Sequence, residues 1–121
     1  MTDPLDRVRA LCLALPGAVE RPTRGQPGWQ IEKGRYFAYF WDNHLSDGET
    51  HVLVKTGGAD EQVMLIEADP GTYRIPPYWG PSGWIALRLD TPDGDWDRVG
   101  DRIAISWELV APARLLEAGG R

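Results

Sequence analysis

The stretch at residues 72–90, TYRIPPYWGPSGWIALRLD, joins an aromatic loop rich in proline and glycine directly to a segment of alternating side chains. Ile85, Leu87 and Leu89 fall at every second position, which is the alternation of a strand that buries one side. Proline and glycine restrict the loop before this strand, and aromatic rings on a stiff loop can form a recognition surface at low entropic cost. The segment therefore predicts a half-buried strand entered from an aromatic surface loop, and nothing in it specifies a reaction.

Two further segments have the spacing of amphipathic helices. Apolar residues recur at helical intervals at residues 5–15, after Asp3 as an N-cap candidate and Pro4 as a suitable first helical residue. A longer helix is expected after Asp95, with a buried stripe made of Trp96, Val99, Ile103, Trp107 and Val110. Pro112 is expected to kink or restart this helix. Helices are thus predicted near both ends of the chain.

The middle of the chain predicts three more strands and a short helix. The strands are expected at residues 29–33, 36–41 and 51–56, and the second, nearly all aromatic, suits a central strand covered on both faces. A short helix at residues 60–68 would bury Val63, Met64 and Ile66. Residues 18–28 are expected to form a polar linker.

The order of these elements predicts the fold class. Short connections between successive strands favour an antiparallel sheet, and the helices would pack on one of its faces, giving an α+β two-layer sandwich. A chain of 121 residues is most simply one domain, which here spans residues 1–121. At this size folding buries roughly two-thirds of the surface of the chain, so no disulfide or metal is needed to hold the fold together.

The charge balance bears on possible partners. The net charge is −5, with 13 Lys and Arg residues against 18 Asp and Glu residues, and the sequence has no basic run. Nucleic-acid-binding domains usually carry a basic surplus, because neutralisation of phosphates drives their affinity. Binding to nucleic acid would therefore require a local basic patch on an acidic body. Nearly all the basic residues are arginine, which suits bidentate or stacked contacts.

The sequence shows no targeting or membrane-spanning signal. The N-terminal residues lack a basic region followed by an uninterrupted apolar run. No apolar run approaches the roughly 20 residues that a membrane span requires. We therefore expect a cytoplasmic protein with no membrane partner.

Residue types that carry catalysis or bind metals are sparse. Cys12 is the single cysteine and belongs to the apolar stripe of the first helix, so a buried, inert thiol is expected. His44 and His51 are the two histidines, and neither belongs to a metal-binding spacing. Helix capping and the helix dipole account for the aspartates near Asp95. We therefore expect a protein with no enzymatic activity, no metal and no cofactor.

Several short motifs, taken in order and with their spacing, resemble the MmcQ/YjbR family of small bacterial proteins across nearly the full chain. The matching pieces are LALPG at residues 13–17, GRYFAYF at 34–40, VLVKT at 52–56, PPYWGPSGW at 76–84 and SWELVAPARL at 106–115. The resemblance implies a CyaY-like sandwich of helices and an antiparallel sheet. It also implies a monomeric DNA-binding module of the double-wing type.

The resemblance extends unevenly to single residues. Lys55 matches the lysine that often ends the third strand, and Tyr78 and Trp84 match the aromatic pair that brackets the loop. Between these aromatics the chain has WGPSG at residues 79–83, where family members often carry Asn, Lys, Arg or His. Ala113 stands where related chains tend to have a lysine. Both departures remove positive charge from the DNA surface that the resemblance implies.

Two hypotheses for function remain open at the level of sequence. In the first, the protein binds DNA through cations on phosphates and aromatic rings stacked on unpaired bases. The residues assigned to this site are Lys55, Arg74, Tyr78, Trp79, Arg88, Arg21 and Arg24. In the second, the loop binds a small ligand or a protein partner, and an anionic group is fixed by Arg74 or Arg88. The aromatic groove would then be formed by Tyr73, Tyr78, Trp79 and Trp84.

Overall fold

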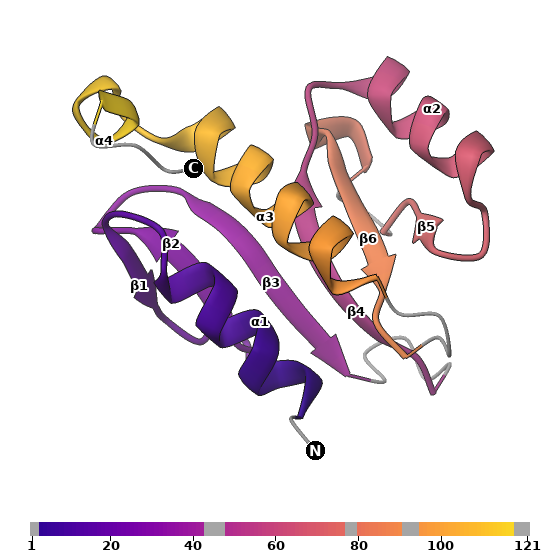
Figure 1. The fold of residues 1–121 in the computed structure, drawn as a ribbon, viewed down its shortest axis with the longest axis horizontal. Helices are drawn as coiled ribbons and strands as arrows, with labels where there is room; N and C mark the ends of the chain where they lie inside the picture. Colours follow the sequence, from indigo (N-terminus) through magenta and orange to yellow (C-terminus); the bar gives the residue numbers. More distant parts are fainter. Residues whose placement is uncertain (1–2, 43–47, 77–79, 91–94, 118–121) are drawn as a thin grey trace.

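A six-stranded antiparallel sheet forms one layer of the computed structural model, which describes residues 3–42, 48–76, 80–90 and 95–117 (Figure 1). The strands are β1 (Ala18–Glu20), β2 (Gly28–Ile31), β3 (Tyr36–Asp42), β4 (Thr50–Lys55), β5 (Tyr73–Arg74) and β6 (Trp84–Arg88). Their spatial order is β1-β2-β3-β4-β6-β5, and every neighbouring pair is antiparallel. The central strands are therefore β3 and β4, while β1 and β5 form the edges.

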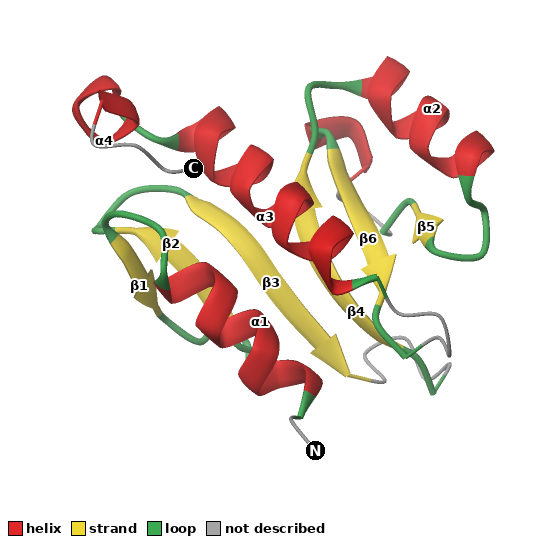
Figure 2. Cartoon of the chain, in the orientation of Figure 1, coloured by secondary structure: helices red, strands yellow, loops and turns green. Residues whose placement is uncertain are grey.

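Helices form the second layer. They are α1 (Pro4–Leu13), α2 (Ala59–Ala68), α3 (Trp96–Val110) and α4 (Ala113–Glu117), with a 3₁₀ turn, η1 (Gly80–Ser82), before β6. Figure 2 shows α1 and α3 side by side on one face of the sheet, with α3 over β3 and β4 and α1 over β1 and β3. α2 lies beyond β6, next to β5. The predicted α+β two-layer sandwich is confirmed. No helix in the described part of the chain is long and apolar enough to cross a membrane.

The two main helices begin where their capping residues predict. Asp3 Oδ1 accepts a hydrogen bond from the Leu5 amide at 2.8 Å, and Pro4 occupies the first turn of α1. Asp95 Oδ1 accepts from the Arg98 amide at 3.0 Å at the start of α3. These bonds satisfy amides that have no partner within the helix. Both predicted N-caps are therefore confirmed.

The main core fills the space between the sheet and the two helices α1 and α3. Its fully buried side chains include Val8, Cys12, Trp29, Phe37, Val52, Val54, Ile85, Leu87, Ile103 and Trp107. The strand register accounts for this set, because Val52 lies opposite Leu87 and Val54 lies opposite Ile85. The alternation predicted for β6 is thus confirmed, and Ala86 belongs to a second, smaller cluster on the other side of the sheet.

A serine of α3 reaches the sheet at the point where β3 and β4 separate. Ser106 Oγ donates a hydrogen bond to the Phe37 carbonyl oxygen at 2.6 Å and accepts one from the Lys55 amide at 2.9 Å. These two backbone groups lie one residue beyond the last β3–β4 pair, which joins Ala38 to Val54. The buried hydroxyl therefore satisfies a donor and an acceptor at the end of the ladder.

Two short strands lie where the sequence predicts irregular structure. β1 takes up the start of the predicted linker at residues 18–28, and β5 takes up Tyr73 and Arg74 of the aromatic loop. Both are edge strands of two or three residues, held by pairing with β2 and β6. The linker prediction was therefore wrong for residues 18–20, because pairing with a neighbour, and not local alternation, makes this segment a strand.

The burial expected for α2 was wrong for two of its apolar residues. Val63 and Met64 are 52% and 59% exposed, whereas Gln62 is buried and its Nε2 donates to the Trp84 carbonyl oxygen at 2.8 Å. Ile66 packs against the main core. Because α2 stands at the edge of the sheet beside β5, only a narrow side of it faces the protein.

Two aromatic segments are less covered than expected. β3 was expected to be covered on both faces, but α1 and α3 pack on one face, so Tyr36 and Tyr39 are only half-buried. Trp96 was expected in the core and is also half-buried. The Arg7 guanidinium lies 4.2 Å from the centroid of the Trp96 ring, which favours a cation–π contact at the surface.

Candidate nucleic-acid interface

The sheet face opposite α1 and α3 carries a row of aromatic rings. Tyr36 and Tyr39 of β3 stack with centroids 4.9 Å apart, and the Trp84 ring of β6 has its centroid 5.3 Å from that of Tyr39. Tyr39 and Trp84 pack over Leu53 and Ala86, which are 0% and 2% exposed, while the rings themselves are half-buried. We call this surface the ring face, and define it as Tyr36, Tyr39, Leu53, Lys55, Trp84 and Ala86.

A glycine in β2 makes room for the two tyrosine rings. Gly28 lies opposite Tyr39, and a Cβ at this position would be 3.0 Å from Tyr36 Cε2 and 3.1 Å from Tyr39 Cδ1. The Tyr36 hydroxyl donates to the Arg21 carbonyl oxygen at 3.1 Å. Burial, assisted by the neighbouring Tyr36, raises the pKa of Tyr39 to about 12, so this phenol stays protonated at alkaline pH values where an ordinary tyrosine ionises.

Three predicted cations lie on or beside the ring face. Lys55 lies opposite Trp84 in the β4–β6 register. Arg21 and Arg24 are exposed in the connection between β1 and β2, and the Arg21 carbonyl oxygen accepts from the Tyr36 hydroxyl. None of these three side chains forms a salt bridge with a residue that the structure describes. The structure therefore leaves positive charge at both ends of the row of rings.

The other two predicted arginines meet at one carboxylate. The Nη1 atoms of Arg74 and Arg88 lie 3.6 and 3.7 Å from the carboxylate oxygens of Glu49, and Arg88 Nε donates to Asp90 at 2.8 Å. His51 is buried, with its Nε2 3.3 Å from Glu49 Oε1. Except for Asp90, these side chains line a pocket of about 340 Å³ together with residues 70–73. Acids thus offset part of the charge of both arginines.

Two of the four residues predicted for the aromatic groove, Tyr73 and Trp84, do not lie together. Tyr73 lies opposite Leu87 on the covered side of the sheet and is 5% exposed in the main core. Trp84 belongs to the ring face, so the structure places the two rings on opposite faces. Tyr78 and Trp79 lie outside the described residues, and their assignment to a site stays a prediction.

Sequence reasoning missed Tyr36 and Tyr39, because a nearly all-aromatic strand was interpreted as doubly covered. The useful signal is the difference between tyrosine and phenylalanine. Phe37 and Phe40 are buried, whereas the two tyrosines, whose rings carry a polar hydroxyl, are only half-buried. In a strand that is almost wholly aromatic, a tyrosine in place of a phenylalanine thus indicates a position that is only partly buried.

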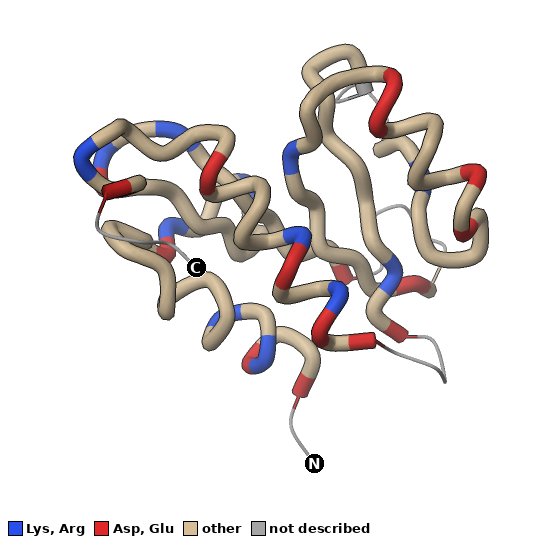
Figure 3. Tube along the Cα trace, turned by 45° about the horizontal axis from the view of Figure 1, so that its top comes forward, with Lys and Arg blue, Asp and Glu red and all other residues tan. Residues whose placement is uncertain are grey.

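Charge is divided unevenly between the two layers (Figure 3). The helices and their caps hold the acids Asp3, Asp6, Asp60, Glu61, Glu67, Asp69, Asp95, Asp97, Asp101, Glu108 and Glu117, against the cations Arg7, Arg9, Arg98, Arg102 and Arg114. The described strands and connections hold the cations Arg21, Arg24, Lys33, Arg35, Lys55, Arg74 and Arg88, against Glu20, Glu32, Asp42, Glu49 and Asp90. The helix layer would therefore repel a phosphate backbone, while the sheet layer would tolerate one.

The buried thiol predicted at Cys12 is confirmed. Cys12 is buried, and burial, with a smaller effect of Glu20, raises the pKa of its thiol well above the ordinary value. Among the described residues, no three His, Cys, Asp or Glu side chains are grouped so that they could hold a metal ion.

Fold and site together define a small α+β protein whose antiparallel sheet presents one aromatic face flanked by cations. The family model described as YjbR matches residues 13–109, and the chain belongs to this family. Among solved structures, the Deinococcus radiodurans protein DR2400, with a domain classed as DUF419, is similar at 18% sequence identity with a TM-score of 0.73. The alignment covers 97% of this chain and 94% of that protein, so the two share a fold. A comparison with curated proteins finds no match.

Proposed function

We propose that the protein is a non-enzymatic DNA-binding module that takes single-stranded DNA on the ring face. The observation that carries this proposal is the continuous row of Tyr36, Tyr39 and Trp84, with adjacent centroids 4.9 and 5.3 Å apart on the face opposite the acidic helices. Stacking of one base on an aromatic side chain contributes about 1–3 kcal/mol and tolerates any sequence. A row of rings therefore favours unpaired bases over a closed duplex.

Cations at both ends of the row would contact the phosphates. Lys55 lies beside Trp84 in register, Arg21 adjoins Tyr36, and Arg24 is exposed in the same connection as Arg21. A backbone that follows the rings from one end to the other would meet these charges in turn. Because the whole chain has a net charge of −5, we expect modest affinity. The phosphate contacts made by the cations should make that affinity fall as salt increases.

Arg74 and Arg88 have a smaller part in this proposal than the sequence predicts. Both are within 3.7 Å of Glu49, and Arg88 also contacts Asp90, so a phosphate would compete with carboxylates for them. The proposal does not depend on Tyr78 or Trp79, which the structure does not describe.

The first test is a titration of the full chain with fluorescein-labelled oligothymidine and with a matched duplex, followed by anisotropy. Salt is varied from about 50 to about 200 mM. We expect saturable binding that is tighter for the single strand. Trp84→Leu should weaken binding roughly tenfold, because one stacking contact is lost. Lys55→Ala should weaken it and reduce the slope of log K against log salt by about 0.7, as expected for one phosphate contact on a single strand.

Lys33→Ala is the matched control, because it removes the same charge from an exposed lysine outside the ring face. It should leave affinity and salt slope unchanged. The proposal fails if no binding occurs at low salt, or if Lys33→Ala and Lys55→Ala have equal effects.

A second candidate function is the binding of a small anionic ligand in the pocket of about 340 Å³ beside β5. The observation that favours it is the convergence of Arg74 and Arg88 on this pocket, which is the role predicted for these arginines from the sequence. Inorganic phosphate should then raise the melting temperature of the protein, and Arg74→Gln should abolish that increase while Arg7→Gln retains it. A shift that persists in Arg74→Gln would remove this candidate.

A further inference from the structure

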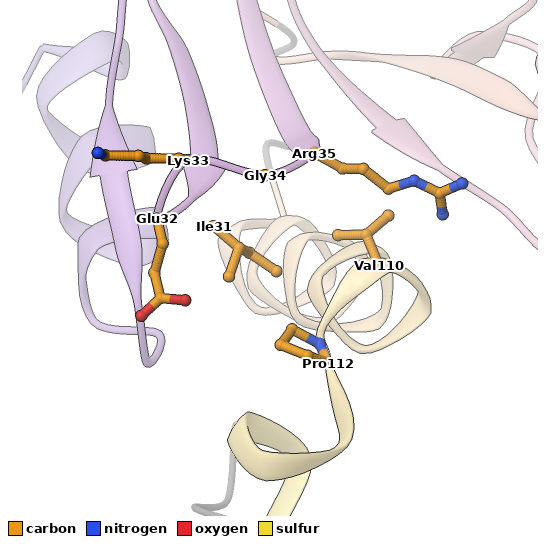
Figure 4. Close-up of a pocket in the computed structure, with 7 residues that line it drawn as sticks. All are labelled: Ile31, Glu32, Lys33, Gly34, Arg35, Val110 and Pro112. Carbon is orange, nitrogen blue, oxygen red and sulfur yellow. The ribbon is translucent and has the colours of Figure 1, made fainter.

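A pocket of about 670 Å³ opens beside the turn between β2 and β3, where α3 is followed by α4 (Figure 4). We call it the hairpin pocket, and it is lined by Ile31, Glu32, Lys33, Gly34, Arg35, Val110 and Pro112. None of these residues belongs to the ring face. The volume lies within the range of roughly 300–1,000 Å³ that is typical of ligand sites.

The floor of the hairpin pocket is apolar and held from two sides. Ile31 is 4% exposed and faces Val110 and Pro112 across the pocket (Figure 4). Leu115 of α4 packs so closely on Gly17 that a Cβ there would be 2.8 Å from Leu115 Cδ1. α4 is thus fixed against the segment before β1, and the floor is formed before any ligand binds.

The backbone of Glu32, at the edge of this floor, has a conformation that residues other than glycine rarely adopt. Its φ is 54°. The Glu32 amide donates to the Gly17 carbonyl oxygen at 2.7 Å, the Glu32 carbonyl oxygen accepts from buried Gln30 Nε2 at 2.8 Å, and Arg114 donates to the Glu32 carboxylate. Backbone strain held in place by several neighbours clusters at binding sites. Here it fixes the turn that carries Lys33 and Arg35.

Two cations flank the apolar floor. Lys33 and Arg35 are exposed, and their side chains extend from the turn in opposite directions (Figure 4). Neither forms a salt bridge with a residue that the structure describes, while Glu32 is paired with Arg114. The lining of the hairpin pocket is therefore locally positive on a chain whose net charge is −5.

We propose that the hairpin pocket docks an acidic peptide segment of a partner protein. One aliphatic or aromatic side chain of that segment would occupy the floor formed by Ile31, Val110 and Pro112, and carboxylates on either side would meet Lys33 and Arg35. An extended peptide suits two diverging cations, because it carries charges on both sides of a central anchor. The anchor supplies the burial of apolar surface, and the charges supply orientation and the rate of association.

The test uses the full chain and a fluorescein-labelled synthetic peptide, Glu-Asp-Leu-Asp-Glu, followed by fluorescence polarisation. One control peptide has serine in place of leucine, and another has glutamine and asparagine in place of the acids. We expect saturable binding of the first peptide and roughly tenfold weaker binding of each control. Lys33→Glu and Arg35→Glu should each weaken the first peptide roughly tenfold. Both positions are exposed, so the variants should melt at the temperature of the parent protein.

Lys55→Glu is the matched control, because it makes the same charge change at a lysine of the ring face and should leave peptide affinity unchanged. The proposal is overturned if the first peptide does not bind, if the serine peptide binds equally well, or if Lys55→Glu weakens binding as much as Lys33→Glu. It is also overturned if sedimentation shows self-association that Lys33→Glu abolishes, because the pocket would then hold a second copy of this chain. The oligothymidine titration involves other residues, so failure of either proposal leaves the other standing.

Discussion

The two faces of the same sheet bury their side chains by different means. On the covered face, α1 and α3 close over Trp29, Ile85 and Leu87, which are fully buried. On the ring face, Leu53 and Ala86 are also buried, but half-exposed rings from neighbouring strands lie over them. The helices bury the side chains of the covered face fully, whereas the rings bury Leu53 and Ala86 and still expose aromatic surface to solvent. The first face therefore contributes mainly stability, and the second combines a smaller contribution with the surface that we propose for DNA binding.

The largest expected effect compares two tryptophans, one from each side of the sheet. Trp107 is fully buried and its Nε1 donates to the Pro16 carbonyl oxygen at 2.9 Å. Trp107→Ala should lower the free energy of unfolding by about 3–5 kcal/mol. Trp84 is half-buried, so Trp84→Ala should cost about 1–2 kcal/mol while weakening oligothymidine binding. Urea denaturation followed by circular dichroism measures both, and equal losses would contradict the contrast between the faces.

An intermediate effect concerns the polar support of the covered face. Glu20 accepts hydrogen bonds from Arg9 at 2.7 and 3.1 Å and from the indole of buried Trp29 at 3.1 Å. Glu20→Ala leaves the indole N–H without this acceptor and should cost about 1–3 kcal/mol. Lys55→Ala, on the ring face, should change stability by no more than about 0.5 kcal/mol. Thermal unfolding of both variants tests the difference, and a larger loss in Lys55→Ala would reverse it.

The same carboxylate gives the covered face a dependence on pH. The hydrogen bond from Arg9 lowers the pKa of Glu20 below its ordinary value, and Arg9 and Trp29 outweigh the opposing effect of burial. Because the folded-state pKa is lower, this contribution to stability is fully present above the unfolded-state value of about 4.3 and is lost as pH falls through the folded value. Glu20→Gln should therefore have a shallower loss of stability below about pH 5 than the parent chain. Identical acid profiles would exclude this role.

The smallest expected effect on stability comes from a variant that shifts the tyrosine rings of the ring face. Gly28→Ala would place a methyl group against Tyr36 and Tyr39, and these half-buried rings can move by a few tenths of an ångström. Stability should change by less than about 1 kcal/mol, because displacement at the surface is less costly than in the core. Oligothymidine affinity should nevertheless fall, since the stack of rings is disturbed. Unchanged affinity would indicate that the geometry of the tyrosine pair does not matter for binding.

Much of the fold could be predicted from local patterns, because each main element carries its own signal. Asp3 and Asp95 mark helix starts through capping, and Ile85 and Leu87 mark the covered side of β6 through alternation. The edge strands β1 and β5 could not be predicted in this way. Their positions depend on partners distant in the sequence, and strands of two or three residues leave too little alternation to detect.

The candidate site was harder to predict, because it depends on which side of a sheet remains uncovered. Lys55, predicted for the DNA site, and Trp84, predicted for the aromatic groove, are adjacent, whereas Tyr73, predicted for the same groove as Trp84, lies in the main core. Tyr73 and Arg74 are the two residues of β5, and successive residues of a strand point to opposite faces of the sheet. The sequence did not predict this strand. The ion pairs that hold Arg74 to Glu49 likewise arise from tertiary structure alone.

Because the Ser106 hydroxyl accepts a hydrogen bond from the Lys55 amide, hydrogen exchange at this amide can report ligand binding on the ring face. The Lys55 N–H is bonded to a side chain of α3, so its exchange with deuterium requires that α3 and the end of β4 move apart. A ligand that steadies Lys55 from the ring face would slow this exchange without touching the amide. Exchange at an amide held by α3 would thereby report ligand binding to the ring face, which α3 does not contact.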